Sequence, residues 1–180
     1  MLGLAAGSVL VGSGRARAQP AAPAVELAAL ELRRGDGVLE LDFAARVRLP
    51  AAVQEALQRG VAVYFVAQAQ LMRARWYWRD ERVARVQRSW RVAYQPLTAS
   101  WRVGFGGLNQ TFPTLAEALA VVTRVSNWRL VELAQIDPDS RYYVDFSWRL
   151  DNSQLPSPMQ IGLAAQGDWA LGIERAVRLE

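Results

Sequence analysis

Alternation of apolar and polar side chains, the pattern of a half-buried β-strand, recurs along most of the chain. It is clearest in residues 38–49 and 141–151. The apolar positions there are Leu39, Leu41, Phe43, Ala45, Val47 and Leu49, then Tyr142, Val144, Phe146, Trp148 and Leu150. Weaker signals predict strands over 25–33, 61–72, 83–94, 99–105 and 127–135, with short edge strands at 159–164 and 169–173. The pattern predicts a mainly β (α+β) fold, either an antiparallel β-sandwich or a strongly curved meander sheet.

Two short helices are expected on this sheet framework, over Pro50–Arg59 and Leu115–Arg124. Proline is tolerated in a first helical turn and glycine follows a last one, as at Pro50 and Gly60. Thr114 and Glu117 have the spacing of a capping box. The stripes expected to be buried are Val53, Ala56 and Leu57 in the first helix and Leu115, Ala118, Leu119 and Val122 in the second.

The N-terminal residues resemble an export signal. An apolar run over 2–12 precedes Ala16-Arg17-Ala18, a small-x-small cleavage pattern. We therefore expect a signal peptide over residues 1–18 with cleavage after Ala18, a Pro/Ala-rich tether over 19–24, and a single domain over 25–180. No basic residue precedes the run, which leaves open a start upstream of Met1; a buried or disordered N-terminal helix is the alternative to export. No later transmembrane span is expected.

The net charge of the chain does not point to a particular class of partner. The 21 basic residues are all arginine, against 17 acidic ones. Removal of the first 18 residues takes away Arg15 and Arg17 and leaves 19 Arg, a net charge of +2. A chain so nearly balanced is not expected to bind nucleic acid in general.

The residue types present exclude several kinds of site. The chain has no Cys and no His, so thiolate nucleophiles, imidazole bases and Cys or His metal ligands are all ruled out. Gly-rich phosphate loops, GxSxG elbows and calcium-loop spacings are also absent from the sequence. We therefore expect no catalytic residues, no metal site and no cofactor.

Residues 61–94 are the first candidate for a binding surface, because they combine arginine with tryptophan. They are expected to form a long two-stranded ribbon with a turn at Asp80-Glu81. That register places Trp76 opposite Arg85 as a cation–π pair and puts five arginines on one face. Such a face suits phosphate or carboxylate groups. The candidate binding residues are Arg73, Arg75, Trp76, Tyr77, Trp78, Arg79, Arg82 and Arg88.

Other interpretations of the same residues remain open. The ribbon arginines could instead pair with Glu40, Asp42, Asp145 or Asp151 on neighbouring strands. Alternating tryptophans are typical of core packing, although exposed coplanar rings would bind carbohydrate. The carboxylate pairs Asp137/Asp139 and Asp145/Asp151 would permit acid–base chemistry on glycan or lipid if they converged.

Several short motifs occur in the order found in a proteobacterial family known as domain of unknown function 4390. The motifs are Leu57 with Gly60-Val61, Arg75-Trp76-Tyr77-Trp78 with Asp80, Tyr94 with Leu97-Thr98, Phe112 with Thr114-Leu115 and Glu117-Ala118-Leu119, Arg149-Leu150-Asp151 with Gln154-Leu155-Pro156 and Pro158, and Asp168-Trp169. The chain resembles this family over most of residues 19–180. The resemblance implies export to the envelope and assigns no catalytic residue. Genes of such proteins tend to lie beside a sensor kinase related to nitrogen regulation, which suggests a link to envelope sensing.

The sequence therefore predicts a non-enzymatic, exported, periplasmic module that binds a protein or an anionic envelope component through the ribbon at 61–94. A carbohydrate-binding module, or a glycan- or lipid-acting enzyme using the Asp pairs, is the alternative.

Overall fold

The structure is a computed structural model that describes residues 24–155 and 167–180. The predicted signal peptide over 1–18, the tether as far as residue 23 and the predicted strand at 159–164 lie outside the described residues.

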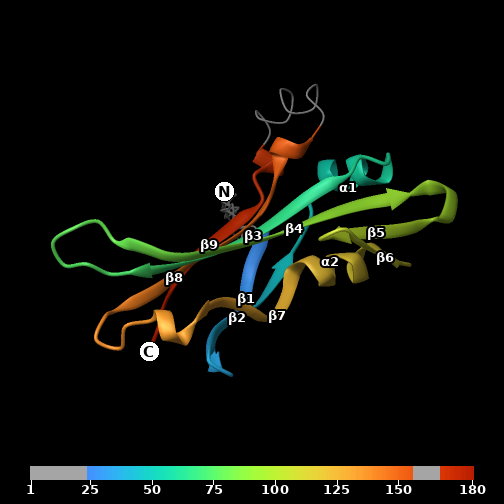
Figure 1. Ribbon diagram of the computed structural model, residues 1–180. Helices are drawn as coiled ribbons and strands as arrows, with labels where there is room; N and C mark the ends of the chain where they lie inside the picture. Colours follow the sequence, from blue (N-terminus) through green and yellow to red (C-terminus); the bar gives the residue numbers. More distant parts are fainter. Residues whose placement is uncertain (1–23, 156–166) are drawn as a thin grey trace, which may run out of the picture.

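Two antiparallel sheets and two α-helices make up the described fold (Figure 1). The strands are β1 (Val25–Gly35), β2 (Val38–Val47), β3 (Val63–Arg73), β4 (Glu81–Gln95), β5 (Ser100–Phe105), β6 (Leu108–Phe112), β7 (Arg124–Glu132), β8 (Tyr142–Leu150) and β9 (Gly172–Arg178). The helices are α1 (Ala51–Gln58) and α2 (Leu115–Thr123), with 3-10 turns η1 (Pro96–Thr98), η2 (Leu133–Gln135), η3 (Asn152–Gln154) and η4 (Gly167–Trp169). The predicted β-rich fold with two short helices is confirmed.

The smaller sheet has the order β1-β2-β7. Its first hairpin turns at Asp36 and Gly37, both with positive φ (48° and 76°), the conformation that a two-residue hairpin loop requires. In β2 the predicted alternation holds, and Leu39, Leu41 and Phe43 are buried.

The larger sheet has the order β6-β5-β4-β3-β8-β9. Its centre is β3, which pairs along its length with both β4 and β8. The five apolar positions predicted for β8 are all buried. The strand Leu108–Phe112 was not predicted, because its sequence LNQTF is polar and it forms an exposed edge. The edge strand expected at 169–173 lies farther along the chain, at Gly172–Arg178.

Both helices form where they are expected. In α1 the predicted stripe Val53, Ala56 and Leu57 is buried, and Gly60 follows with φ of 84°. In α2 the Thr114 hydroxyl accepts a hydrogen bond from the Glu117 amide (3.2 Å). Of the stripe predicted for α2, Ala118 and Val122 are buried, whereas Leu115 and Leu119 are partly exposed at the edge of the core.

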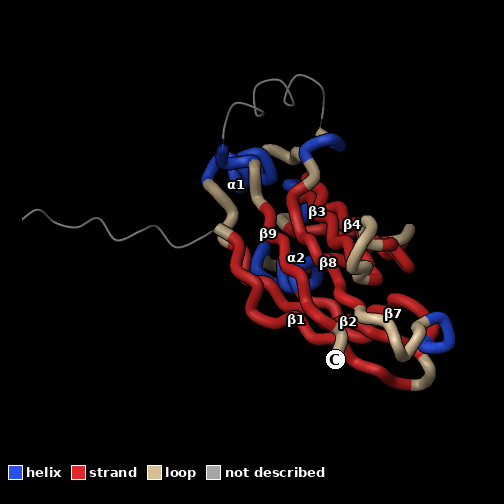
Figure 2. Tube along the Cα trace, turned by 90° about the vertical axis from the view of Figure 1, so that its left-hand side faces the viewer, coloured by secondary structure: helices blue, strands red, loops and turns tan. Residues whose placement is uncertain are grey.

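The hydrophobic core lies between the two sheets. Phe43 of the smaller sheet meets Phe146 of the larger one with ring centroids 4.8 Å apart. α2 fills one side of this interface, in contact with β2 and β7 on one side and β5 and β6 on the other. Figure 2 shows β1, β2 and β7 beneath the larger sheet, with α1 at the opposite end. Within this arrangement the hairpin of β3 and β4 extends beyond its neighbours (Figure 1).

Candidate functional site

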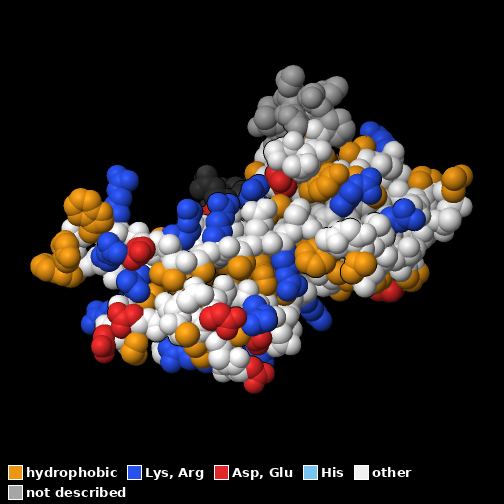
Figure 3. Space-filling model, viewed as in Figure 1, with side chains coloured by type: hydrophobic (Ala, Val, Ile, Leu, Met, Phe, Trp, Pro, Cys, Tyr) orange, Lys and Arg blue, Asp and Glu red, His pale blue; other side chains and the backbone are white. Residues whose placement is uncertain are grey.

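The connection between β3 and β4 carries the largest exposed aromatic cluster among the described residues. It comprises residues 74–80, which we name the aromatic tip. Trp76 is 92% exposed, and Tyr77 and Trp78 are each 72% exposed. Figure 3 shows hydrophobic side chains gathered at the far end of this hairpin, with basic side chains beside them. Large apolar rings exposed to water at a protruding end make this loop a candidate interaction surface.

Hydrogen bonds fix the base of the aromatic tip. One Asp80 oxygen accepts the backbone N–H of Arg75 (3.0 Å), closing the loop on itself. The other accepts the hydroxyl of Tyr143 (2.7 Å), which lies in the neighbouring strand β8. The Ala74 amide also donates to the Arg141 carbonyl (2.9 Å). The tip is therefore braced against β8 while its rings stay exposed.

A second set of contacts centres on Glu81, the residue after Asp80 and the first residue of β4. Glu81 pairs with both Arg75 and Arg73, the latter at 3.6 Å. The Arg73 guanidinium also donates to the Tyr142 hydroxyl (3.0 Å) and lies 5.5 Å from the centre of that ring. The side chains of Asp80 and Glu81 are thus both directed toward the base of the tip. The Arg79 side chain forms no ion pair or hydrogen bond with any described residue.

The brace changes the proton affinities of its two partners. Hydrogen bonds from the Tyr143 hydroxyl and then from the Arg75 amide lower the pKa of Asp80 below its ordinary value. The same bond to the Asp80 carboxylate raises the pKa of Tyr143 to about 12. At neutral pH the pair is therefore a carboxylate that accepts from a neutral phenol, the arrangement that favours the hydrogen bond.

The predicted ribbon exists, but its predicted register is wrong. The turn is not a two-residue turn at Asp80-Glu81; seven residues connect the strands, and Arg85 lies opposite Gln70 instead of Trp76. The predicted Trp76–Arg85 cation–π pair is consequently absent. The seven-residue connection is held by bonds to Arg141 and Tyr143, residues far along the chain that the local sequence does not reveal.

The expectation of arginines along one face is also wrong. Arg73 and Arg88 lie on the inner face of the sheet, Arg73 against Tyr142 and Arg88 opposite the buried Ala67. Arg82 lies on the outer face, where it contacts Gln70. Arg75, Trp76, Tyr77, Trp78 and Arg79 form the aromatic tip. The structure thus brings five of the eight candidate residues together in the tip. Arg73 lies at its base, where it shares Glu81 with Arg75, and Arg82 and Arg88 lie apart on opposite faces of the sheet.

The alternative partners expected for these arginines are not used either. Asp42 pairs with Arg33, and Asp151 pairs with Arg149 (3.4 Å). The ribbon arginines that form ion pairs use Glu81 instead.

Core packing of tryptophan is confirmed for five of the seven residues. Trp90, Trp101, Trp128, Trp148 and Trp169 are buried. The prediction is wrong for Trp76 and Trp78, because the strand alternation that suggested burial continues past the true end of β3 into the tip.

The carboxylate pairs do not form a site. Asp145 lies within β8 and Asp151 directly follows its last residue. A spacing of six residues along extended chain separates the two carboxylates by about 20 Å. Acid–base pairs on glycosides are separated by about 5–10 Å. Asp137 accepts from the Asp139 amide (3.0 Å) and the Ser140 hydroxyl (2.8 Å), contacts that lower the pKa of Asp137 and serve the predicted turn. No group of three or more acidic side chains in residues 24–155 and 167–180 is arranged to hold a metal ion.

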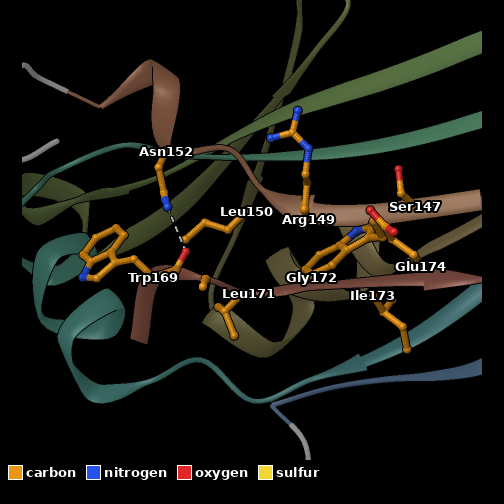
Figure 4. Close-up of a pocket in the computed structure, with 11 residues that line it drawn as sticks. Ser147, Arg149, Leu150, Asn152, Trp169, Leu171, Gly172, Ile173 and Glu174 are labelled. Atoms are coloured by element: carbon orange, nitrogen blue, oxygen red, sulfur yellow. Dashed lines mark hydrogen bonds between the residues drawn. The ribbon is translucent and has the colours of Figure 1, made fainter. Parts of the chain in front are cut away.

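A cavity of about 370 Å³ lies where β8 ends and β9 begins (Figure 4). Arg149 and Glu174 line it from neighbouring strands, and the Asn152 side chain donates to the Trp169 carbonyl (2.9 Å) beside it. The Asn152 side-chain oxygen and the Trp169 indole nitrogen are buried and have no hydrogen-bond partner among the described residues. The chain between these two residues includes 156–166, outside the described part, so we assign no ligand to this cavity.

Comparison with known proteins agrees with the resemblance noted in the sequence. No curated protein and no solved structure matches the chain significantly. The family described as "Domain of unknown function (DUF4390)" matches residues 22–178, nearly the whole chain. The protein therefore belongs to the DUF4390 family.

Proposed function

We propose that this protein is a non-enzymatic, exported binding module whose aromatic tip attaches it to an anionic surface of the cell envelope, namely the headgroup region of a bilayer containing acidic phospholipid. The observation that supports this most is the exposure of Trp76, Tyr77 and Trp78 at the end of a braced hairpin. Tryptophan and tyrosine are the residues enriched where protein meets the membrane–water interface, because each has an apolar body and a polar atom.

The size of the tip favours a bilayer over a folded protein as the partner. The three exposed rings offer on the order of 400–500 Å² of contact surface. A stable protein interface uses about 800 Å² from each partner. A protruding loop can insert its rings between headgroups without matching the shape of a partner surface.

Charge supports the choice of acidic lipid. Arg75 and Arg79 flank the three rings, while Asp80 and Glu81 are directed toward the base of the hairpin. An unpaired arginine near an anionic bilayer contributes about 1 kcal/mol of attraction, whereas Arg75 is already paired with Glu81. Arg79, without a partner among the described residues, is the side chain freest to contribute.

Export belongs to the same proposal. It rests on the apolar run over 2–12 and the cleavage pattern ending at Ala18, both outside the described residues. Within the described residues, none of the helices has the length and apolar character needed to cross a bilayer.

Carbohydrate binding is less well supported by the same tip. The Trp76 and Tyr77 rings are 4.8 Å apart but inclined at 73°, an edge-to-face pair. A sugar-binding platform of two rings needs them to share a plane, and the Trp76–Tyr77 pair does not meet this requirement.

Flotation with lipid vesicles tests the proposal on residues 19–180, the chain that cleavage after Ala18 would release. We expect it to float with vesicles containing phosphatidylglycerol and to float less with pure phosphatidylcholine or at high salt. Replacing both Trp76 and Trp78 with serine should weaken binding about tenfold or more, because the rings lose their apolar burial.

Leu97 provides a matched control, since it is also fully exposed but lies in η1, away from the tip. The variant Leu97→Ser should bind as the wild type does. Equal binding by wild type and the double tip variant would show that the tip is not the contact. Absence of vesicle binding, with tip-dependent capture of an envelope protein such as a sensor kinase, would assign the surface to a protein partner instead.

A further inference from the structure

A second surface, independent of the aromatic tip, lies at the side of the sheet interface beside α2. It is a cleft of about 280 Å³, here named the Arg88 cleft. Its principal lining residues are Arg88, Trp90, Phe105, Leu108, Val121 and Arg124. They come from β4, β5, β6, α2 and β7, so both sheets and the helix contribute to its walls.

The Arg88 side chain is positioned by aromatic rings and not by a carboxylate. Its guanidinium carbon lies 5.5 Å from the centre of the Phe105 ring and 5.3 Å from that of Trp128. A cation–π contact of this kind holds the guanidinium through the faces of the rings and does not use up its N–H groups as a carboxylate would.

Those N–H groups have no acceptor among the described residues. Neither Arg88 nor Arg124 forms an ion pair or a side-chain hydrogen bond there. None of the ten residues that line the cleft is acidic. Burial of Arg88 beside apolar neighbours lowers its pKa, which reflects the cost of holding an unpaired cation away from water.

We propose that the Arg88 cleft binds a small amphiphilic organic anion, with its charged oxygens between the Arg88 and Arg124 guanidiniums and its hydrocarbon chain against Phe105, Leu108 and Val121. A forked pair of N–H donors matches a carboxylate or phosphate, and the apolar walls match a short alkyl chain. The cleft lies just below the usual size range of ligand pockets, so the ligand is small.

The site is separate from the aromatic tip. Arg88 lies eight residues beyond Asp80 along an extended strand, a distance of about 25 Å. The inference therefore does not depend on the membrane contact proposed above, and variants of the tip should leave it unchanged.

Titration calorimetry with octanoate tests the proposal on residues 19–180. Wild type should bind octanoate at one site. It should bind octan-1-ol about tenfold or more weakly, because this ligand lacks the charge. Acetate lacks the hydrocarbon chain, so its binding should not saturate. Arg88→Gln should weaken octanoate binding about tenfold or more, and Arg124→Gln should weaken it to a smaller extent because this side chain is exposed.

Arg85→Gln is the matched control, since Arg85 lies on the same strand but on the outer face, bonded to Gln68. This variant should bind octanoate as the wild type does. Amide and indole NMR shifts in wild type should move at Trp90, Phe105 and Trp128, a readout that holds even if Arg88→Gln fails to fold. Absence of octanoate binding, equal binding of octanoate and octan-1-ol, or shifts centred elsewhere would overturn the proposal.

Discussion

The Asp80 carboxylate shows how one residue determines where the aromatic tip begins. It accepts hydrogen bonds from Arg75 within the loop and from Tyr143 on the neighbouring strand. Without these bonds the alternating sequence after Arg73 would favour continuation of the strand. The exposure of the three rings thus depends on a polar side chain whose hydrogen bonds go to Arg75 and Tyr143.

The Asp80–Tyr143 bond predicts a specific pH dependence. The folded-state pKa of Asp80 lies below its ordinary value, so the bond stabilises the tip above that value and is lost as the pH falls through the lowered pKa. The pKa of Tyr143 is raised from 10.0 to about 12, so its contribution is complete below pH 10 and is lost as the pH rises through about 12.

The phenolate absorbance of wild type minus that of Tyr143→Phe measures this ionisation. We expect one tyrosine to ionise at about 12 and to return toward 10 in Asp80→Asn, where the carboxylate charge is gone. A wild-type difference titration centred near 10 would contradict the bond.

At the scale of single elements, the join between β2 and β7 depends on Asn127. This residue has φ of 52°, in the left-handed region, where the pairing of the two strands shifts register. Its amide donates to Asp42 (2.7 Å) and its side-chain oxygen accepts from Arg33 (3.0 Å), while Arg33 also pairs with Asp42. Three strands therefore meet at one irregular position.

Substitution at Asn127 should separate backbone strain from side-chain contacts. Asn127→Val should lower the free energy of unfolding by about 1–2 kcal/mol, because a β-branched residue resists the left-handed conformation. Asn127→Gly should cost less, since glycine adopts that conformation freely and loses only the Arg33 contact. Urea unfolding midpoints measure the difference. Ser126→Val, at the exposed neighbouring position, is the control; an equal loss in all three variants would mean that φ is not the cause.

The sequence predicted those elements whose signals are local. β2 and β8 follow from strict alternation, and both helices follow from Pro50, Gly60 and the Thr114 cap. The strand β6 was missed because an exposed edge needs no apolar face. The register of β3 and β4 was missed because residues 74–79 keep the alternating pattern of a strand, while the bonds to Arg141 and Tyr143 that hold them as a loop come from distant residues.

The same distinction applies to the two candidate sites. Five of the predicted binding residues cluster in the aromatic tip, since they are adjacent in sequence. The Arg88 cleft could not be predicted, because Arg88 meets Phe105 and Trp128 only through the packing of two sheets.

At the scale of the whole molecule, one buried hydrogen bond joins α2 to the larger sheet. The Trp148 indole donates to the Val122 carbonyl (2.8 Å), and Trp148 is fully buried and stacked on Phe65 with ring centroids 5.1 Å apart. Val122 is in the last turn of α2, where carbonyls lack a partner within the helix. The bond therefore satisfies a helix end from a strand 26 residues away in sequence.

Two substitutions of Trp148 should distinguish the contribution of the hydrogen bond from that of core packing. Trp148→Phe keeps a ring in the core but leaves the Val122 carbonyl unpaired, so the free energy of unfolding should fall by about 1–3 kcal/mol. Trp148→Ala also opens a cavity and should cost about 3–5 kcal/mol. Urea unfolding measures both, and amide exchange at the end of α2 should increase in Trp148→Phe. A wild-type exchange rate there would show that packing alone holds the helix. Because α2 supplies Val121 to the Arg88 cleft, whereas the bonds that brace the aromatic tip involve Arg141, Tyr143 and Glu81 and no residue of α2, Trp148→Phe should weaken octanoate binding and leave vesicle binding unchanged.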